Sequence, residues 1–335
     1  MRVASCAALC VASLLMLPCS SSVARAAEWK PLAQSLITEQ KPGYGGLCGV
    51  LVERTSGDVY LNVSDRGLFR STDQGANWKR VGEEFKGRTE TPGCMLFDPT
   101  GKSKRMLIAL VYGGPIILAP ELSSTWSTLD KKVNHVDWAA IDWVDPQPKF
   151  VLTLKHESGG DLLASHDGGK SFSEVAKGYG PGWVFDATTA VVAQAKSRDK
   201  ASGGLVRTTD GGKTFSACGE YSARANPRLY DGTLYWLTEN SLIATTDQGQ
   251  TWKKLSDVKG GLYGPVFGHT AKQMFLVTSA GVVESTDGGA TWGTAIALPK
   301  EMKGASVMTW LDYDPKHDLL YTVKMSSDLY SLEHK

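Results

Sequence analysis

The chain has 335 residues, with 36 Lys and Arg against 35 Asp and Glu, and 42% of its residues are hydrophobic. Such a balanced charge argues against nucleic acid or an anionic membrane surface as the main partner. After the N-terminal segment, no stretch stays apolar for long enough to cross a bilayer as a helix, so we expect no membrane span.

The first 26 residues are typical of a secretory signal peptide. Arg2 gives a positive start, residues 7–17 form an apolar run too short to span a membrane, and residues 24–26 (Ala-Arg-Ala) fit the cleavage rule. Removal of the signal would leave 34 basic against 35 acidic residues. We therefore predict that residues 27–335 form the mature chain, exported to a bacterial periplasm or to the outside of the cell.

One eight-residue pattern occurs five times in the mature chain. It begins with a hydroxyl residue, has Asp two positions later and Gly two positions after that, and ends on an aromatic residue. The five copies span residues 71–78, 165–172, 208–215, 245–252 and 285–292. A repeat at nearly constant spacing indicates an array of similar structural units.

Each copy has the chemistry of a tight turn. The Asp carboxylate can accept hydrogen bonds from backbone N–H groups of its own turn, and Gly can take a positive φ without a Cβ clash. A short apolar run precedes each copy, as at Leu68 and Phe69, so we predict a β-hairpin around every turn. The aspartates predicted to have this structural role are Asp73, Asp167, Asp210, Asp247 and Asp287.

The spacing of the copies predicts a propeller. A weaker sixth copy spans residues 119–126, and successive copies start 48, 46, 43, 37 and 40 residues apart, close to the roughly 40–50 residues of a propeller blade. A seventh unit, residues 308–331, is one strand short. Residues 28–32 resemble the strand that follows the repeats, so we expect them to complete the last blade and close the ring. The prediction is one all-β, seven-bladed β-propeller over residues 27–335, with six or eight blades as alternatives.

The repeated pattern resembles the Asp-box, or BNR repeat, of sialidase-like β-propellers over most of the chain. In that family the box is a turn between the two outer strands of a blade and faces away from any active site. The chain lacks the Arg-Ile-Pro signature of sialidases, so the resemblance does not imply a standard sialidase. Photosystem II assembly factors of the propeller type are also similar in length, export signal and repeats. That resemblance implies a non-catalytic protein that binds a protein client, although their Gly-Trp pairs before the second strand are not evident here.

The cysteines leave two alternatives open. The signal could instead be that of a lipoprotein anchored through Cys19, but Pro18 stands where such a signal requires a small residue. Cys48 and Cys94 lie at the starts of two neighbouring predicted inner strands, where they form either a disulfide or two small buried thiols. We expect Cys218 to be unpaired. With three cysteines and no His–Cys cluster at ligand spacing, the mature chain is predicted to have no metal site and no cofactor.

The residues around the channel suggest a glycan ligand. In a propeller, the loops before the inner strands and the hairpins between the second and third strands share one face. Aromatic faces stack on sugars and Arg holds carboxylates, so a glycan, including an acidic one, fits a central pocket. The predicted binding residues are Tyr44, Arg88, Glu90, Trp138, Tyr179, Trp183, Arg224, Arg228, Tyr263 and Trp310. The alternative is that the tryptophans fill the channel as core and that the charged residues form ordinary ion pairs.

Four residues in the third predicted blade are the candidates for catalysis: His135, Asp137, His156 and Glu157. A His beside an acid can act as a general base or acid near neutral pH. Two facing carboxylates can hydrolyse a glycosidic bond, and His with Tyr and Arg would suit a lyase reaction. No spacing rule selects among these reactions.

Two functions from different classes therefore remain open. One is an exported protein that binds a glycan and, if it is an enzyme, cleaves it as a glycoside hydrolase or a polysaccharide lyase. The other is a non-catalytic propeller that binds an exported protein as an assembly or scaffold factor. We expect a monomer in both cases. A pocket filled by Trp138, Trp183 and Trp310 would count against the first function.

Overall fold

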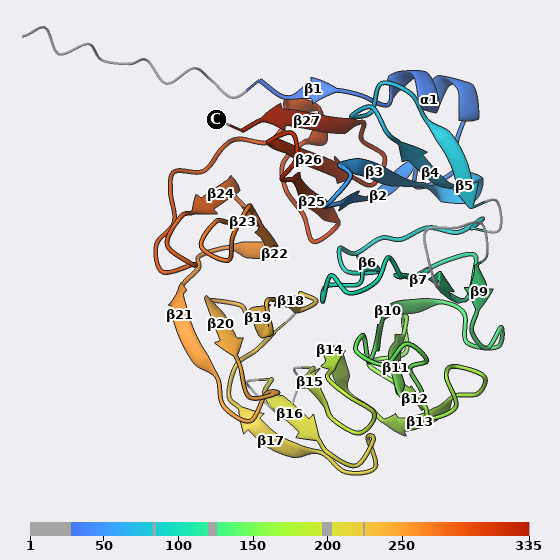
Figure 1. Ribbon diagram of the computed structural model, residues 1–335, viewed down its shortest axis with the longest axis vertical. Coiled ribbons are helices and arrows are strands. Elements are labelled where there is room, and N and C mark those ends of the chain that lie inside the picture. Colours follow the sequence, from blue (N-terminus) through green and yellow to red (C-terminus); the bar gives the residue numbers. More distant parts are fainter. Residues whose placement is uncertain (1–27, 83–84, 120–125, 196–202, 224, 335) are drawn as a thin grey trace, which may run out of the picture.

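The structure is a computed structural model that describes residues 28–82, 85–119, 126–195, 203–223 and 225–334. These residues form seven antiparallel sheets set around a central axis like the blades of a propeller (Figure 1). The first strand of each blade lies toward the axis and the later strands lie toward the rim. The predicted all-β, seven-bladed propeller is therefore confirmed.

The first three blades have four strands each. Blade one contains β2 (Leu47–Glu53), β3 (Asp58–Val63), β4 (Gly67–Ser71) and β5 (Lys79–Gly82), with the 3₁₀ helix η1 (Ser64–Arg66) before β4. Blade two contains β6 (Met95–Phe97), β7 (Met106–Ala109), β8 (Ile116–Ala119) and β9 (Ser127–Thr128). Blade three contains β10 (Val136–Ile141), β11 (Val151–Lys155), β12 (Leu162–Ser165) and β13 (Ser173–Ala176).

The other four blades continue the same order around the ring. Blade four contains β14 (Tyr179–Val184), β15 (Ala190–Gln194), β16 (Leu205–Thr208) and β17 (Ser216–Gly219). Blade five contains β18 (Arg228–Tyr230), β19 (Thr233–Leu237), β20 (Ser241–Thr245) and β21 (Lys253–Asp257). Blade six contains β22 (Gly261–Phe267), β23 (Met274–Thr278) and β24 (Gly281–Ser285). Blade seven contains β25 (Thr309–Asp314), β26 (Leu319–Lys324) and β27 (Leu329–Glu333), which follow the 3₁₀ helix η2 (Lys300–Met302).

Burial along the strands follows from how the blades pack. Second strands such as β23 (Met-Phe-Leu-Val-Thr) are buried at every position, because each of their two faces packs against a neighbouring blade. Outer strands such as β13 (Ser-Glu-Val-Ala) carry polar residues and are partly exposed. The apolar core is therefore a ring of layers between blades, and the site residues are carried on the loops at its ends.

The N-terminal segment closes the ring, as predicted. Strand β1 (Lys30–Pro31) pairs with β27, with Lys30 opposite Ser331 and Pro31 opposite Tyr330. The short helix α1 (Gln34–Gln40) follows, which we did not predict from the sequence. Within the described residues, no helix has the length and apolar character needed to cross a membrane.

The repeated turns share one hydrogen-bond pattern, illustrated by the turn at Asp167. The Ser165 hydroxyl donates to Asp167 Oδ1 at 2.7 Å and accepts from the Gly169 N–H at 2.8 Å. The Ser171 hydroxyl donates to Asp167 Oδ2 at 2.6 Å. Gly169 has a φ of 81°, a conformation that favours glycine. The same carboxylate contacts occur at Asp73, Asp210, Asp247 and Asp287, with an Asn amide replacing the second hydroxyl at Asp73.

In the Asp247→Asn variant, the free energy of unfolding is expected to fall less steeply at acid pH than in the wild type. Hydrogen bonds from the Thr251 hydroxyl and then its N–H lower the pKa of Asp247 to about 2, below the value of about 3.9 in an unfolded chain. The carboxylate therefore stabilises the fold fully above about pH 4, and this contribution is lost as the pH falls toward 2. Urea unfolding from pH 2 to 6 measures the slope. Gln250→Ala, which changes the same turn without touching the carboxylate, should keep the wild-type slope, and an equally steep Asp247→Asn profile would contradict the prediction.

The repeated turns and the histidine loops lie at opposite ends of the blades. In blade three the His156 N–H donates to the His135 carbonyl at 2.9 Å, at the end where β10 begins. The Gly168 N–H of the repeated turn donates to the Lys149 carbonyl at 3.0 Å, in the loop where β10 and β11 meet at the other end. We call the end with the loops before the first strands the mouth face. The turns face away from it, as expected.

Blade six departs from the expected pattern. After its repeated turn, only the isolated bridge between Val282 and Ile296 stands where the other blades have a fourth strand. The weaker sixth copy of the pattern cannot be described as a turn, because residues 120–125 lie outside the described part of the chain.

The structure decides between the two alternatives for Cys48 and Cys94. Cys48 and Cys94 are free, buried thiols, so the disulfide that we considered between them is not formed. The Cys48 thiol donates to the Gly45 carbonyl at 3.5 Å, and the Cys94 thiol donates to the Asp137 carbonyl at 2.8 Å. Burial raises the pKa of both thiols to about 12, so they stay protonated at neutral pH. Cys218 in β17 is free as well.

Candidate functional site

The four predicted catalytic residues come together on the mouth face of blade three. Strands β10 and β11 pair in a hairpin with Val136 opposite Lys155, which places His135 beside His156. The two imidazole rings stack with centroids 4.8 Å apart. We call these two histidines, with Asp137, Glu157 and Tyr112, the histidine cluster.

Asp137 and Tyr112 bind the two nitrogens of His156. Asp137 Oδ1 lies 2.5 Å from His156 Nδ1, so the carboxylate holds the imidazole in one orientation. The Tyr112 hydroxyl lies 3.0 Å from His156 Nε2 and 3.2 Å from Glu157 Oε1. Loss of solvation, and then the hydrogen bond to Glu157, raise the pKa of Tyr112, so its phenol stays protonated at neutral pH. This Tyr–His–Asp chain can pass a proton between the mouth and Asp137.

His135 has an unsatisfied nitrogen. Its Nε2 atom is buried, makes no hydrogen bond within the described structure, and lies 3.9 Å from Glu157 Oε2. His135 and Glu157 also have positive φ angles, 67° and 54°, which are uncommon for residues other than glycine. The sequence predicted no metal site, yet His135, His156 and Glu157 place three ligand atoms within 4.8 Å of one another.

Arg88 connects the histidine cluster to the rim of the mouth. Its guanidinium lies 4.1 Å from the centre of the Tyr112 ring and 4.7 Å from that of the Tyr44 ring. Its Nε donates to Glu90 Oε1 at 2.6 Å, so the predicted alternative of an ion pair holds for these two residues. Tyr44 itself is 76% exposed.

Cavities open beside these residues, and two of them bear on the site. One, of about 500 Å³, lies against blade three and is lined by His135, His156, Glu157, Lys155, Asp161 and Glu174, among others. The other, of about 400 Å³, draws its walls from blades two to seven and therefore lies at the channel itself. Its apolar walls include Leu154, Leu237, Leu262 and Val307, and Asp137 and Glu239 also line it.

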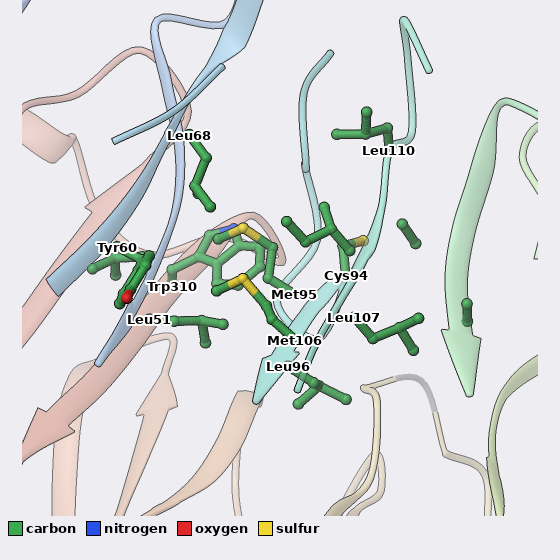
Figure 2. Packing of buried hydrophobic residues seen from close by; sticks show 14 of the residues in the cluster. Leu51, Tyr60, Leu68, Cys94, Met95, Leu96, Met106, Leu107, Leu110 and Trp310 are labelled. Atoms are coloured by element: carbon green, nitrogen blue, oxygen red, sulfur yellow. The ribbon is translucent and has the colours of Figure 1, made fainter. Parts of the chain in front are cut away.

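The structure corrects the predicted aromatic binding platform. Trp183 and Trp310 are 3% and 0% exposed and belong to the main hydrophobic core, and Figure 2 shows Trp310 within it. Trp138 and Tyr263 line the channel cavity but are only 3% and 1% exposed. At exposures of 3% or less, none of these four rings presents a face on which a sugar could stack.

The remaining predicted binding residues are scattered. Tyr179, at the start of β14, is half-buried and packs against Phe215. The Arg228 guanidinium lies 5.0 Å from the centre of the Tyr263 ring. Loss of solvation lowers the pKa of Arg228 to about 10, although Asp312 partly opposes this. Arg224 lies outside the described residues.

Comparisons with known proteins identify the fold. No known family model matches the chain, and no curated protein matches its sequence. The solved structure of YCF48 bound to D1 peptide is 14% identical, with a TM-score of 0.53 over 93% of this chain and 96% of that one. The β-propeller domain of Cps50 (Swd1) from Myceliophteria thermophila is 10% identical, with a TM-score of 0.58 over 88% of this chain and 98% of that one.

A third solved structure spans a longer protein. The extracellular domain of a putative one-component system from B. thetaiotaomicron is 10% identical, with a TM-score of 0.56 over 91% of this chain and 40% of that one. At these identities the likeness extends to the fold alone. The chain is thus a seven-bladed β-propeller, similar in fold to proteins of differing function.

Proposed function

We propose that this chain is an exported, non-catalytic β-propeller that holds a peptide segment of a protein partner at its mouth face. The observation that carries the proposal is the distribution of apolar side chains around the mouth. Trp138, Trp183 and Trp310 are buried, whereas Tyr44 and Val307 are 76% and 56% exposed. The glycan interpretation depended in part on stacking by the three tryptophans, and their burial removes that part of its support.

The channel cavity suits a peptide side chain. Its walls are mostly apolar, with Leu154, Leu237 and Leu262 among them, and Val307 stands exposed at its edge. Small apolar cavities with a few polar groups are the usual form of a specific binding pocket. An apolar side chain of the partner would bury its surface there, while Asp137 and Glu239 can accept hydrogen bonds from backbone N–H groups.

The Tyr44–Arg88–Tyr112 stack offers a second anchoring point. The backbones of Arg88 and Tyr112 pair, with the Arg88 N–H donating to the Tyr112 carbonyl at 2.9 Å, so this part of the loop is held in place before any partner arrives. Tyr and Arg are enriched among the residues that contribute most to protein–protein binding. A preformed contact also loses less side-chain entropy on binding.

Two further points support the proposal. The YCF48 structure, which has the same fold, is described with a bound peptide, so a ring of this kind can hold one. Residues 1–26 have the features of an export signal, which would bring the chain to exported partners. The proposal also takes the repeated turns as Asp-boxes, with a structural role on the face away from the partner.

Photo-crosslinking at position 44 tests the proposal. A photoreactive phenylalanine in place of Tyr44 is expected to capture one protein partner in the cell, because position 44 faces the partner. The same residue in place of Val144 should capture none, since Val144 is 62% exposed but lies in the β10–β11 loop on the opposite face. With the partner identified, Tyr44→Ala and Val307→Asp should each weaken binding at least tenfold, as expected for the loss of a central contact of about 1.4 kcal/mol or more.

A glycan ligand would give the opposite result. Purified mature chain would then show a thermal shift with acidic or neutral oligosaccharides, with or without product release, and no crosslinked partner. Equal capture at positions 44 and 144 would also overturn the proposal, because it would mean that the mouth face has no special affinity.

A further inference from the structure

We infer that His135, His156 and Glu157 form a binding site for a divalent transition-metal ion. Each residue offers one ligand atom, and the three atoms lie within 4.8 Å of one another. Glu157 Oε1 is 3.7 Å from His156 Nε2, and Glu157 Oε2 is 3.9 Å from His135 Nε2. Bond lengths of about 2.0–2.1 Å put tetrahedral ligand atoms roughly 3.3 Å apart, so small side-chain movements close the site around an ion.

The residues behind His156 prepare it for coordination. Asp137 accepts the Nδ1–H of His156 at 2.5 Å, which leaves Nε2 as the ligand atom. Metal-bound histidines nearly always donate their other ring N–H to a carboxylate or a carbonyl in this way. The Tyr112 hydroxyl lies 3.0 Å from Nε2, so an ion bound to that nitrogen would displace the hydroxyl.

The environment of His135 gives a second, independent observation. Its Nε2 atom is buried, has no hydrogen-bond partner among the described residues, and lies 3.9 Å from Glu157 Oε2. A buried polar atom that makes no hydrogen bond destabilises the fold, and a bond to a metal ion would remove that cost. Two of the three proposed ligands, His135 and Glu157, have positive φ angles.

The ligand set selects the class of ion. Two imidazoles and one carboxylate suit Zn²⁺ and neighbouring transition metals, whereas Ca²⁺ and Mg²⁺ take oxygen ligands. Three protein ligands leave a coordination position open for water or for a group of a partner. His135, His156 and Glu157 all line the cavity of about 500 Å³ against blade three, so an ion held by them would be reachable from it.

Cobalt and zinc titrations of the purified mature chain test the site. Co²⁺ is expected to give a visible d–d absorption band that saturates at one equivalent. Added Zn²⁺ should displace the Co²⁺ and abolish the band. His135→Asn, which keeps a residue tolerant of positive φ, and Glu157→Gln should each lower affinity more than about 100-fold, because each removes a ligand. Asp137→Asn, a positioning change, should lower it roughly 10- to 100-fold. Tyr112→Phe should keep the band, since the phenol is not a ligand.

His269→Ala is the matched control. His269 Nε2 lies 2.9 Å from Asp318 Oδ1 and 3.2 Å from the Tyr313 hydroxyl. This histidine therefore also contacts an Asp and a Tyr, but it is not one of the proposed ligands. This variant should bind Co²⁺ like the wild type. Absence of the band in the wild type would overturn the inference, and so would wild-type affinity in both ligand variants when circular dichroism shows them folded. Because this experiment measures metal binding, its outcome does not depend on whether the crosslinking experiment finds a protein partner.

Discussion

Replacing Trp310 with alanine is expected to lower the free energy of unfolding by about 3–5 kcal/mol, the range for large aromatic residues removed from a core. The ring lies in β25 of blade seven and is fully buried, and its N–H donates to the Glu90 carbonyl of blade two at 3.3 Å. A Cβ on Gly49 of blade one would lie 2.8 Å from the ring. Three blades therefore pack around the indole, and one strand cannot shift to fill the cavity. Urea unfolding measures the change.

Tyr44→Ala is the control for this prediction. It also removes an aromatic ring from a residue near the mouth, but from one that is 76% exposed. Exposed substitutions usually change stability by no more than about 0.5 kcal/mol, so the comparison isolates the effect of burial. A Trp310→Ala protein within about 1 kcal/mol of wild type would mean that the ring is not part of the core. It would also return the glycan interpretation to consideration.

Removal of residues 28–40 is expected to open the ring and to cost roughly 5 kcal/mol in stability, from lost backbone hydrogen bonds and apolar burial. These residues supply β1 and α1, the Leu32 N–H that donates to the Leu329 carbonyl at 2.8 Å, and the buried side chain of Leu36. The outer edge of β27 would then be unpaired, and exposed edges promote aggregation. Thermal unfolding and light scattering on the truncated chain measure both effects.

A synthetic peptide of residues 28–40 gives the sharpest form of this experiment. Added in excess, it should restore the unfolding temperature and suppress aggregation, because an extended peptide can add a strand to a free edge. Lys30→Ala in the full chain is the control, since the Lys30–Glu333 ion pair is exposed and such pairs contribute little. A truncated chain that melts like the full one would contradict closure by β1.

Part of the candidate site could be predicted because its residues flank one hairpin. His135 and His156 lie at matching positions beside the paired strands β10 and β11, so the hairpin register brings them together. The same register could have revealed the candidate metal ligands, which we missed because we sought ligand spacing along the chain. Tyr112 comes from blade two, and no local pattern connects it to His156. Only the packing of two blades places its hydroxyl there.

The orientation of the aromatic residues could not be predicted for a related reason. Side chains alternate between the two faces of a strand, so a bulge reverses the face of everything beyond it. The pairing register shifts between Val136 and Trp138, between Tyr179 and Gly182, and on both sides of Tyr263. Trp310 lies in a regular strand, and its burial depends on the neighbouring blades, which the sequence does not place.

The sequence by itself determined the blade architecture, because the repeated turns are held by hydrogen bonds within seven successive residues and need no distant partner. It also determined the closing strand, since residues 28–32 carry the same pattern as the strands after the repeats. The tertiary structure alone decided that the tryptophans belong to the core and that Tyr112 and Arg88 meet at the mouth. The tryptophans pack between different blades, and Arg88 and Tyr112 come from two separate loops, the one before β6 and the one between β7 and β8. The geometry of these contacts depends on bulges and on packing around the ring.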